Sequence, residues 1–281
     1  MPSYDDSIGG RGHDTVFRST DGLRLRGTFV DALTEPSSVT VLIHGGGVTR
    51  DEGGFFTRLA AGLSNVGIAS LRFDLRGHGE SEGRQEDLTL SSVLNDIGSA
   101  IAHARALAGS APANVLGASF GGGICGYFAA RHPDRVRRLV LVNPLINYKK
   151  RFIDDKPYWS DDQIDEAAGQ ELLKNGFLVH SPTFRLGRPL LNEVFYLRPD
   201  EAIGSITTPT LIVHGTKDTF IPIDSSRHHI ARIQAETRLL EIEGAQYYSP
   251  RSWSEKNLVT DVKIGRCACR GLGDGGGSRG V

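Results

Sequence analysis

A serine flanked by glycines is the residue of this chain best suited to nucleophilic chemistry. Ser119 lies in the sequence GASFG at residues 117–121, directly after the apolar pair Val115 and Leu116 and before a run with helical apolar spacing. A G-x-S-x-G pattern between a strand and a helix is typical of a sharp turn that holds a serine hydroxyl above a sheet. We therefore predict that Ser119 is a nucleophile, and the alternative is a purely structural turn.

Backbone N–H groups that would stabilise a developing oxyanion are expected beside this serine. Phe120 follows Ser119 at the predicted N-terminus of a helix, where N–H groups point outward and the helix dipole favours negative charge. A second glycine loop, HGGG at residues 44–47, follows the β-branched run 39–43. A phosphate cradle is the alternative for this loop, but the G-x-G-x-x-G spacing and a P-loop lysine are both missing.

The elements that must position these residues alternate between strands and helices. Such repeated units predict an α/β fold with a mostly parallel sheet, helices on both faces, and a ligand beyond the carboxyl ends of the strands. An antiparallel edge hairpin is expected first, because Asp21-Gly22 forms a turn between two alternating segments. The expected strands are 16–19, 23–30, 39–43, 68–73, 114–118, 136–142, 210–213 and 237–242, and the expected helices include 51–63, 88–107 and 223–233.

The strand–helix alternation stops between residues 145 and 205. This segment is rich in charged and aromatic residues, is too long for a simple loop, and contains plausible helices at 161–175 and 188–196. We predict a helical cap insertion at 145–205 over the site, and the alternative is an insertion without substrate contact. The α/β core is then expected at 16–144 and 206–264.

The C-terminal part of the core is expected to end in a closing helix at residues 251–264. The Gly/Arg-rich residues 265–281 have no apolar face and are predicted to be disordered. Cys267 and Cys269 resemble half of a metal site, but no further ligands accompany them, so no metal is predicted.

Composition excludes several classes of function. The 281-residue chain has a formal net charge of −1, which gives no electrostatic case for binding nucleic acid. No apolar stretch approaches the length of a membrane span, and residues 1–14 lack the apolar core of a signal peptide. Three cysteines cannot build a disulfide framework, which favours a reducing compartment, and we predict a cytoplasmic protein.

Four motifs in order resemble one family of enzymes. The chain is similar to α/β-hydrolases, close to the serine aminopeptidase, lysophospholipase and feruloyl-esterase-like branch, across residues 16–250. The motifs are HGGG at 44–47, DLRGHGES at 74–81, GASFG at 117–121 and HGTKD at 214–218. The resemblance implies that Ser119 is the nucleophile and Asp218 the acid of a catalytic triad. It also implies that the backbone N–H groups of Gly46 and Phe120 form the oxyanion hole.

The resemblance fails at the third member of the triad. The family places its histidine in a Gly-Ala-x-His pattern after the last strand, whereas here Gly244-Ala245-Gln246 is followed by Tyr247. A phenol, with a reference pKa of about 10, is a weak base near neutral pH. His214 is a weak candidate for a substitute base, although a loop-shaping role is favoured for it. His44 and His78 belong to loop motifs and are expected to be structural.

The sequence therefore leads to two main hypotheses. The first is a serine hydrolase that cleaves a small-molecule carboxylic ester or thioester through an acyl-enzyme on Ser119, with amide and carbon–carbon bond hydrolysis left open. The second is a catalytically impaired protein of the same fold that binds an acyl ligand or a partner, because Tyr247 stands where histidine is expected. A nucleotide-binding protein is disfavoured by the missing phosphate motifs. No organic cofactor is implied, and the oligomeric state is not predicted.

Overall fold

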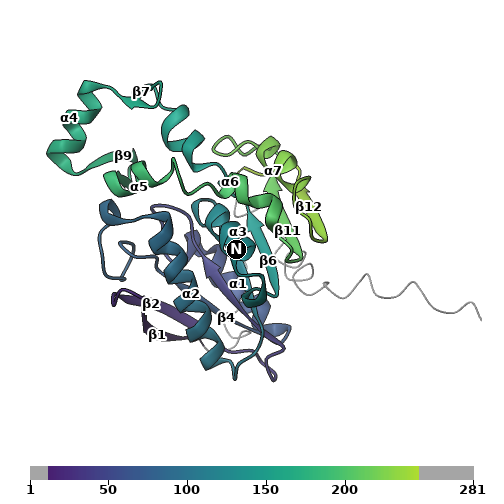
Figure 1. The fold of residues 1–281 in the computed structure, drawn as a ribbon. Coiled ribbons are helices and arrows are strands. Elements are labelled where there is room, and N and C mark those ends of the chain that lie inside the picture. Colours follow the sequence, from purple (N-terminus) through teal and green to yellow (C-terminus); the bar gives the residue numbers. More distant parts are fainter. Residues whose placement is uncertain (1–11, 247–281) are drawn as a thin grey trace, which may run out of the picture.

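An eight-stranded sheet forms the centre of the computed structural model, which describes residues 12–246 (Figure 1). Tyr247, the expected closing helix and the tail lie outside the described residues. The strand order is β1-β2-β4-β3-β5-β6-β11-β12. The strands are β1 (Gly12–Arg18), β2 (Arg24–Val30), β3 (Ser38–Ile43), β4 (Ile68–Phe73), β5 (Ala113–Ala118), β6 (Arg138–Val142), β11 (Thr210–Gly215) and β12 (Thr237–Ile242).

The sheet combines an antiparallel edge hairpin with parallel strands, as the sequence predicts. β1 and β2 form an antiparallel hairpin at one edge, and β2 pairs antiparallel with β4. The remaining neighbours pair in parallel, so β3, β5, β6 and β11 all direct their carboxyl ends to the same edge of the sheet. The turn of the hairpin uses Gly22 at φ 95°, a left-handed conformation that glycine adopts without steric cost. The predicted edge hairpin and parallel sheet are confirmed.

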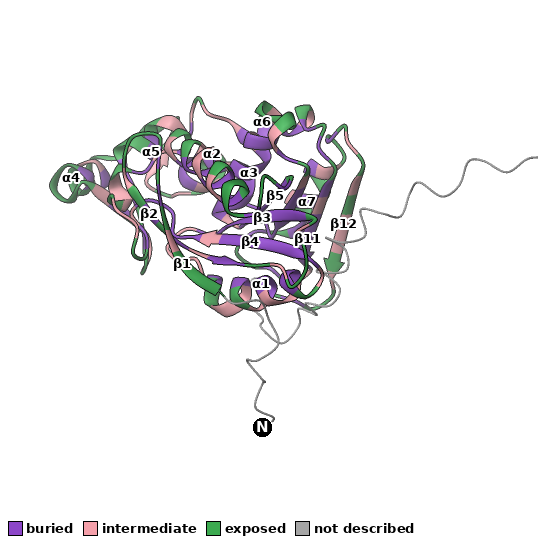
Figure 2. Ribbon diagram, turned by 90° about the horizontal axis from the view of Figure 1, so that it is seen from below, coloured by how far each residue is buried: buried purple, intermediate pink, exposed green. Residues whose placement is uncertain are grey.

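Helices cover both faces of the sheet, as alternation along the buried strands requires. Val41 and Ile43 belong to the apolar cluster that includes residues of α2 (Leu90–Leu107) and α3 (Phe120–Arg131). Leu42 points the other way and packs in the cluster that contains the apolar face of α1 (Phe55–Asn65). All six residues of β3 are buried, and Figure 2 shows β3 and β4 mostly in the buried colour. The edge strand β1 is largely exposed, and the other edge strand, β12, alternates between intermediate and exposed residues.

The chain leaves this sheet between β6 and β11, and we refer to residues 145–205 as the cap segment. It forms the lobe at the upper left of Figure 1, and its order combines helices with two short hairpins. The elements are a π-helical turn (Lys150–Asp154), β7 (Trp159–Ser160), β8 (Gln163–Ile164), α4 (Glu166–Asn175), β9 (Phe177–Ser181), β10 (Phe184–Gly187), α5 (Arg188–Glu193) and α6 (Pro199–Ala202). The helix α7 (Ile223–Ile230) and four 3₁₀ turns, Glu52–Gly54, Gln85–Asp87, Pro133–Arg135 and Ile203–Ser205, complete the described elements.

The segment predicted as a helical cap contains two short hairpins in addition to its helices. The helix predicted at 161–175 begins only at Glu166, because Asp161 and Asp162 adopt φ values of 50° and 60° in the turn between β7 and β8. Asp165 then caps α4 by accepting a hydrogen bond from the N–H of Ala168 at 2.8 Å. The β9–β10 hairpin was not predicted at all. The second predicted helix, at 188–196, exists as the shorter α5.

Candidate active site

Ser119 occupies a strained turn between β5 and α3. Its φ of 48° and ψ of −117° lie in a region that side chains rarely adopt, and strain of this kind is concentrated at functional sites. The turn is held by hydrogen bonds from the Ser119 N–H to the Val142 carbonyl at 3.0 Å and from the Leu145 N–H to the Ser119 carbonyl at 2.9 Å. A Cβ on Gly117 would lie 2.6 Å from the carbonyl oxygen of Gly121, so the glycines of the motif are required by close packing.

The HGGG loop is fixed by side chains on either side of Gly46. The carboxylate of Glu52, a buried residue, accepts a hydrogen bond from the Gly45 N–H at 2.7 Å. The Gly47 N–H donates to Nε2 of His78 at 3.1 Å. The N–H of Gly46 itself has no hydrogen-bond partner among residues 12–246. The N–H of Phe120, the first residue of α3, belongs to the first turn of that helix, where N–H groups have no intrahelical acceptor. Gly46 and Phe120 thus both have N–H groups that are free to donate to a ligand.

His44 and His78 serve the loops rather than the chemistry. Nε2 of His44 accepts a hydrogen bond from the Leu75 N–H at 2.9 Å, and its Nδ1 lies 2.7 Å from the Gly45 carbonyl. These partners assign a neutral ring with the proton on Nδ1. Burial, with a contribution from nearby His78, lowers the pKa of His44 to about 3. Burial likewise lowers the pKa of His78. The structural roles expected for both residues agree with this geometry.

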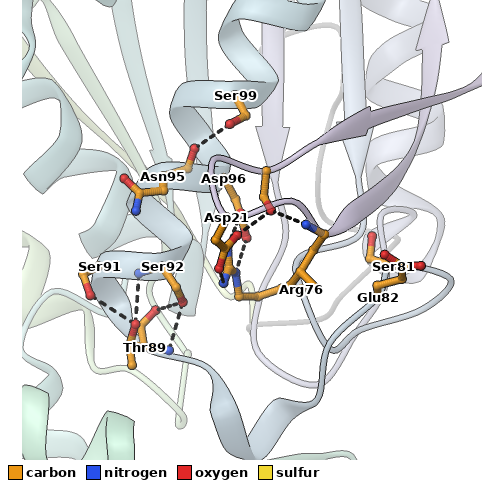
Figure 3. A network of polar contacts seen from close by, with 12 residues as sticks. Asp21, Arg76, Ser81, Glu82, Thr89, Ser91, Ser92, Asn95, Asp96 and Ser99 are labelled. Carbon is orange, nitrogen blue, oxygen red and sulfur yellow. Dashed lines mark hydrogen bonds and ion pairs between the residues drawn. The ribbon is translucent and has the colours of Figure 1, made fainter.

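The loop at residues 74–81 is anchored by a buried arginine (Figure 3). The Arg76 guanidinium donates to both carboxylate oxygens of Asp96 on α2, at 2.6 and 2.8 Å, and to both oxygens of Asp21 in the first hairpin. The Asp96 side chain is fully buried. The same loop carries His78, which accepts the hydrogen bond from the Gly47 N–H, so the ion network helps to hold a residue that contacts the glycine loop.

The cap segment contacts the HGGG loop and the start of α3 through Phe184 on β10. A Cβ on Gly46 would lie 2.6 Å from the ring of Phe184, so the ring is in direct contact with the glycine loop. The Phe184 ring also meets Phe120 edge-to-face at 5.2 Å between centroids. Phe184 is 3% exposed. One aromatic side chain of the cap segment therefore touches both residues whose N–H groups are the candidate oxyanion donors.

Asp218 lies after β11 in a dense set of donors. Its Oδ1 accepts hydrogen bonds from the N–H groups of Phe220 at 2.7 Å and Ile221 at 3.0 Å, and its Oδ2 accepts from Nδ2 of Asn143 at 2.5 Å. Burial alone would raise the pKa of Asp218, but hydrogen bonds from His214, these backbone groups and Asn143 together hold that pKa below its usual value. Asp218 is therefore a carboxylate at neutral pH.

Asn143 and Glu52 are site residues that the sequence analysis missed. Asn143 follows β6 with φ 43° and links the turn after that strand to the acid loop, since its Oδ1 also accepts from the Gly215 N–H at 3.4 Å. The sequence contained one signal for Asn143, because it is a polar residue that precedes a proline at the end of a buried strand. Glu52 had no signal, because its role depends on a carboxylate reaching back to Gly45.

His214 is close to Asp218 but has other partners. Its Nε2 lies 3.5 Å from Oδ2 of Asp218 and 2.8 Å from the Ile221 carbonyl, and its Nδ1 lies 2.8 Å from Oγ of Ser226. The carbonyl assigns the proton to Nε2, so Nδ1 accepts from the serine hydroxyl. The fully buried ring is thereby engaged at both nitrogens. This geometry favours the loop-shaping role over that of a base for Ser119.

Other kinds of site were sought in the described residues. No cluster of three or more His, Cys, Asp or Glu within 12–246 is arranged to hold a metal ion. None of the helices in that range combines the length and apolar character needed to cross a membrane. Cys267 and Cys269 lie outside the described residues.

Comparisons with known proteins agree with this architecture. A family model for the alpha/beta hydrolase fold matches residues 39–188. A monoacylglycerol lipase of Mycolicibacterium smegmatis is 28% identical over 248 residues, covering 81% of this chain and 87% of the lipase. A pimeloyl-[acyl-carrier protein] methyl ester esterase of Chromobacterium violaceum is 30% identical over 228 residues, covering 71% of this chain and 83% of the esterase.

Solved structures show the same fold. Est1E from Butyrivibrio proteoclasticus, solved with bound ferulic acid, superposes with a TM-score of 0.74 at 23% identity, covering 89% of this chain and 96% of Est1E. The family model spans more than half of the chain, from Val39 in β3 to Arg188 in α5. This chain is a member of the α/β-hydrolase family.

Proposed function

We propose that this chain is a serine hydrolase that cleaves a carboxylic ester or thioester through an acyl-enzyme on Ser119. The observation that carries the proposal is the strained Ser119 turn at the start of α3. It is supported by the contact of the Phe184 ring with both Gly46 and Phe120, the two proposed N–H donors. The Ser119 oxygen attacks the acyl carbon, and the two donors stabilise the oxyanion that forms. The leaving alcohol or thiol departs, and water then releases the acid from Ser119.

The proton of Ser119 needs a base, and the chain departs from its family at this point. The lowered pKa of Asp218 keeps it a carboxylate, the form in which the acid of a triad supports an imidazolium. The family position of that imidazole is Tyr247, outside the described residues. We propose that turnover is slow for this reason. In other serine hydrolases the loss of the histidine costs on the order of 10⁶ in turnover, and the oxyanion hole with substrate binding retains about 10³ over water.

The relatives favour an ester among the possible substrates. One is named as a lipase of monoacylglycerol and another as a methyl ester esterase. The cap segment adds an aromatic roof, since Phe152 and Phe184 both lie against Phe120 beside the proposed nucleophile. We propose that residues 145–205 act as a cap and that this roof contacts an acyl or aryl group. The buried free thiol of Cys125 supports a reducing, cytoplasmic location.

A catalytically impaired binding protein is the second candidate. It is favoured by the engagement of both ring nitrogens of His214, because no other histidine contacts Asp218 within residues 12–246. Such a protein would keep the oxyanion hole and the aromatic roof and would bind an acyl ligand without cleaving it. The two candidates differ in one property, namely turnover that depends on Ser119.

Hydrolysis of p-nitrophenyl butyrate separates the two candidates. The parent chain and its Tyr247→His variant are each assayed with and without Ser119→Ala. We expect slow release of p-nitrophenol by the parent chain, lost in Ser119→Ala, and faster release by Tyr247→His. If only Tyr247→His turns over, the binding protein is the better account. If release by the parent chain and by Tyr247→His is unaffected by Ser119→Ala, the serine mechanism is wrong.

A further inference from the structure

The π-helical turn Lys150–Asp154 of the cap segment spans the proposed active site from one side to the other. The ring of Phe152 lies 6.3 Å from that of Phe120, next to the nucleophile. Its neighbour Arg151 places its guanidinium carbon 4.8 Å from the ring centroid of Phe220, whose N–H donates to Asp218. The consecutive residues Arg151 and Phe152 thus contact a neighbour of Asp218 and a neighbour of Ser119, respectively. π-helical turns are rare and occur frequently at functional sites.

The carboxylates in and near this turn form ion pairs with Lys149, just before the turn, and with Lys150. Lys149 forms ion pairs with Asp154 at 2.7 Å and with Asp162 at 2.8 Å. Lys150 forms an ion pair with Asp155. These carboxylates are therefore paired with Lys149 and Lys150.

Of the cations at residues 149–156, Arg151 and Lys156 form no ion pair with a carboxylate among residues 12–246. They lie near each other: burial lowers the pKa of Lys156, the charge of Arg151 lowers it further, and Asp155 opposes this. Two neighbouring cations with no carboxylate in contact repel each other in a partly buried place. An anion between them would remove that repulsion.

His180 on β9 completes the cluster. Its ring meets Phe152 edge-on, with 5.1 Å between centroids and an angle of 89°, and lies 6.0 Å from Phe184. Its Nδ1 is buried and has no hydrogen-bond partner in the part of the chain that the structure describes. Burial and then the charges of Lys156 and Arg151 lower the pKa of His180 to about 3, so the ring is neutral at pH 7. A buried polar atom without a partner is costly, which points to a ligand that supplies one.

We propose that Arg151, Lys156 and His180 form a subsite for a carboxylate carried by the acyl part of the substrate. The two cations supply charge, and the neutral imidazole supplies one ring N–H as a hydrogen-bond donor. Phe152 packs against His180 and Phe120 together, so the subsite adjoins the nucleophile across one aromatic ring. The subsite deepens the proposed function and rests on it, because it assigns the substrate class to the monoesters of dicarboxylic acids.

Binding to the full-length Ser119→Ala chain tests the subsite without turnover. Calorimetric titration compares monomethyl glutarate with methyl glutaramate, in which a neutral amide replaces the carboxylate. We expect the anion to bind about tenfold more tightly, the order of one charge-assisted hydrogen bond. Arg151→Gln and Lys156→Gln, each added separately, are expected to remove most of this preference. Lys174→Gln is the matched control, since Lys174 is exposed in the last turn of α4.

Three results would overturn the subsite. These are equal or tighter binding of the amide, a preference that survives both Arg151→Gln and Lys156→Gln, and no saturable binding of monomethyl glutarate. Thermal unfolding of each variant checks that the fold is retained. A separate assay follows hydrolysis of p-nitrophenyl esters by the parent chain. If it shows no turnover while the anion preference is intact, the proposed function fails and the carboxylate subsite stands.

Discussion

The hydroxyl of Tyr148 donates a hydrogen bond to the carbonyl oxygen of Phe120, the residue that follows the proposed nucleophile. The oxygen of the Tyr148 hydroxyl in turn accepts a hydrogen bond from the Ile124 N–H at 3.0 Å. In a regular α-helix that N–H would bond directly to the Phe120 carbonyl, so Tyr148 is inserted into the first turn of α3. Gly123 leaves room for it, since a Cβ there would lie 2.7 Å from Cε2 of Tyr148. The start of the cap segment thus fixes the peptide next to the oxyanion donor.

Tyr148→Phe is therefore expected to impair catalysis more than binding. It leaves a buried carbonyl and a buried N–H without their partner, which costs about 1–3 kcal/mol of stability. We expect kcat to fall about tenfold with KM little changed, because the Phe120 N–H acts on the transition state. Steady-state kinetics on the most active form of the chain and urea unfolding provide the measurements. Tyr127→Phe, on the same helix, is the control, and an equal effect there would contradict the assignment.

Gly46→Ala tests the contact between the cap segment and the glycine loop. The added methyl group would lie 2.6 Å from the Phe184 ring, so either the loop or the β9–β10 hairpin must move. We expect kcat to fall by about 10²-fold, as for the loss of one oxyanion donor. Gly126→Ala is the matched control, because a Cβ there makes only ordinary contacts, 3.5 Å from Ile203. Unchanged kcat in Gly46→Ala would remove this loop from the proposed oxyanion hole.

The Arg76 network gives a stability prediction that does not depend on activity. Arg76→Leu leaves the buried carboxylate of Asp96 without its counter-charge, which is expected to cost about 3–5 kcal/mol in urea unfolding. Adding Asp96→Leu should restore much of the loss, because an apolar pair carries no buried charge. Arg24→Leu breaks the exposed ion pair with Glu82 and should have a much smaller effect. A double variant as unstable as Arg76→Leu alone would contradict this view.

The lowered pKa of the buried His44 leads to a prediction of how stability depends on pH. Its pKa is about 3 in the folded chain, below the ordinary value near 6.5, so between these limits only the unfolded chain binds a proton there. The free energy of unfolding should therefore fall as the pH drops from 6.5 toward 3, by about 1.4 kcal/mol per pH unit for this one group. His44→Gln should show a shallower fall by that amount in urea unfolding between pH 6 and 4. An unchanged slope would mean that His44 is protonated in the fold.

The sheet and the nucleophile turn were predictable because their signals are local. The strand at residues 237–242 appears as Thr237–Ile242, and the runs before the HGGG and GASFG motifs become β3 and β5 within one residue. The buried strands β3 and β5 are mostly apolar runs that end in glycine turns, so their bounds can be recognised without tertiary contacts.

The cap hairpins and the supporting residues were not predictable because their determinants are distant or weak. The turn at Asp161 and Asp162 needs two consecutive non-glycine residues at positive φ, which is uncommon even though Asp tolerates it better than most residues. Asn143 acts through Asp218, which lies 75 residues away in the sequence. Tyr148 and Phe184 look like core aromatics in the sequence, and only packing against Phe120 connects them to the site.

The central claim, that Ser119 is a nucleophile, is tested most directly by covalent labelling. The parent chain is incubated with a p-nitrophenyl alkylphosphonate, which phosphonylates an activated serine, and its digested peptides are examined by mass spectrometry. We predict one adduct, on the peptide that contains Ser119, forming faster in Tyr247→His and absent from Ser119→Ala. An unmodified Ser119 peptide in both the parent chain and Tyr247→His, or labelling that persists at another residue in Ser119→Ala, would contradict the claim.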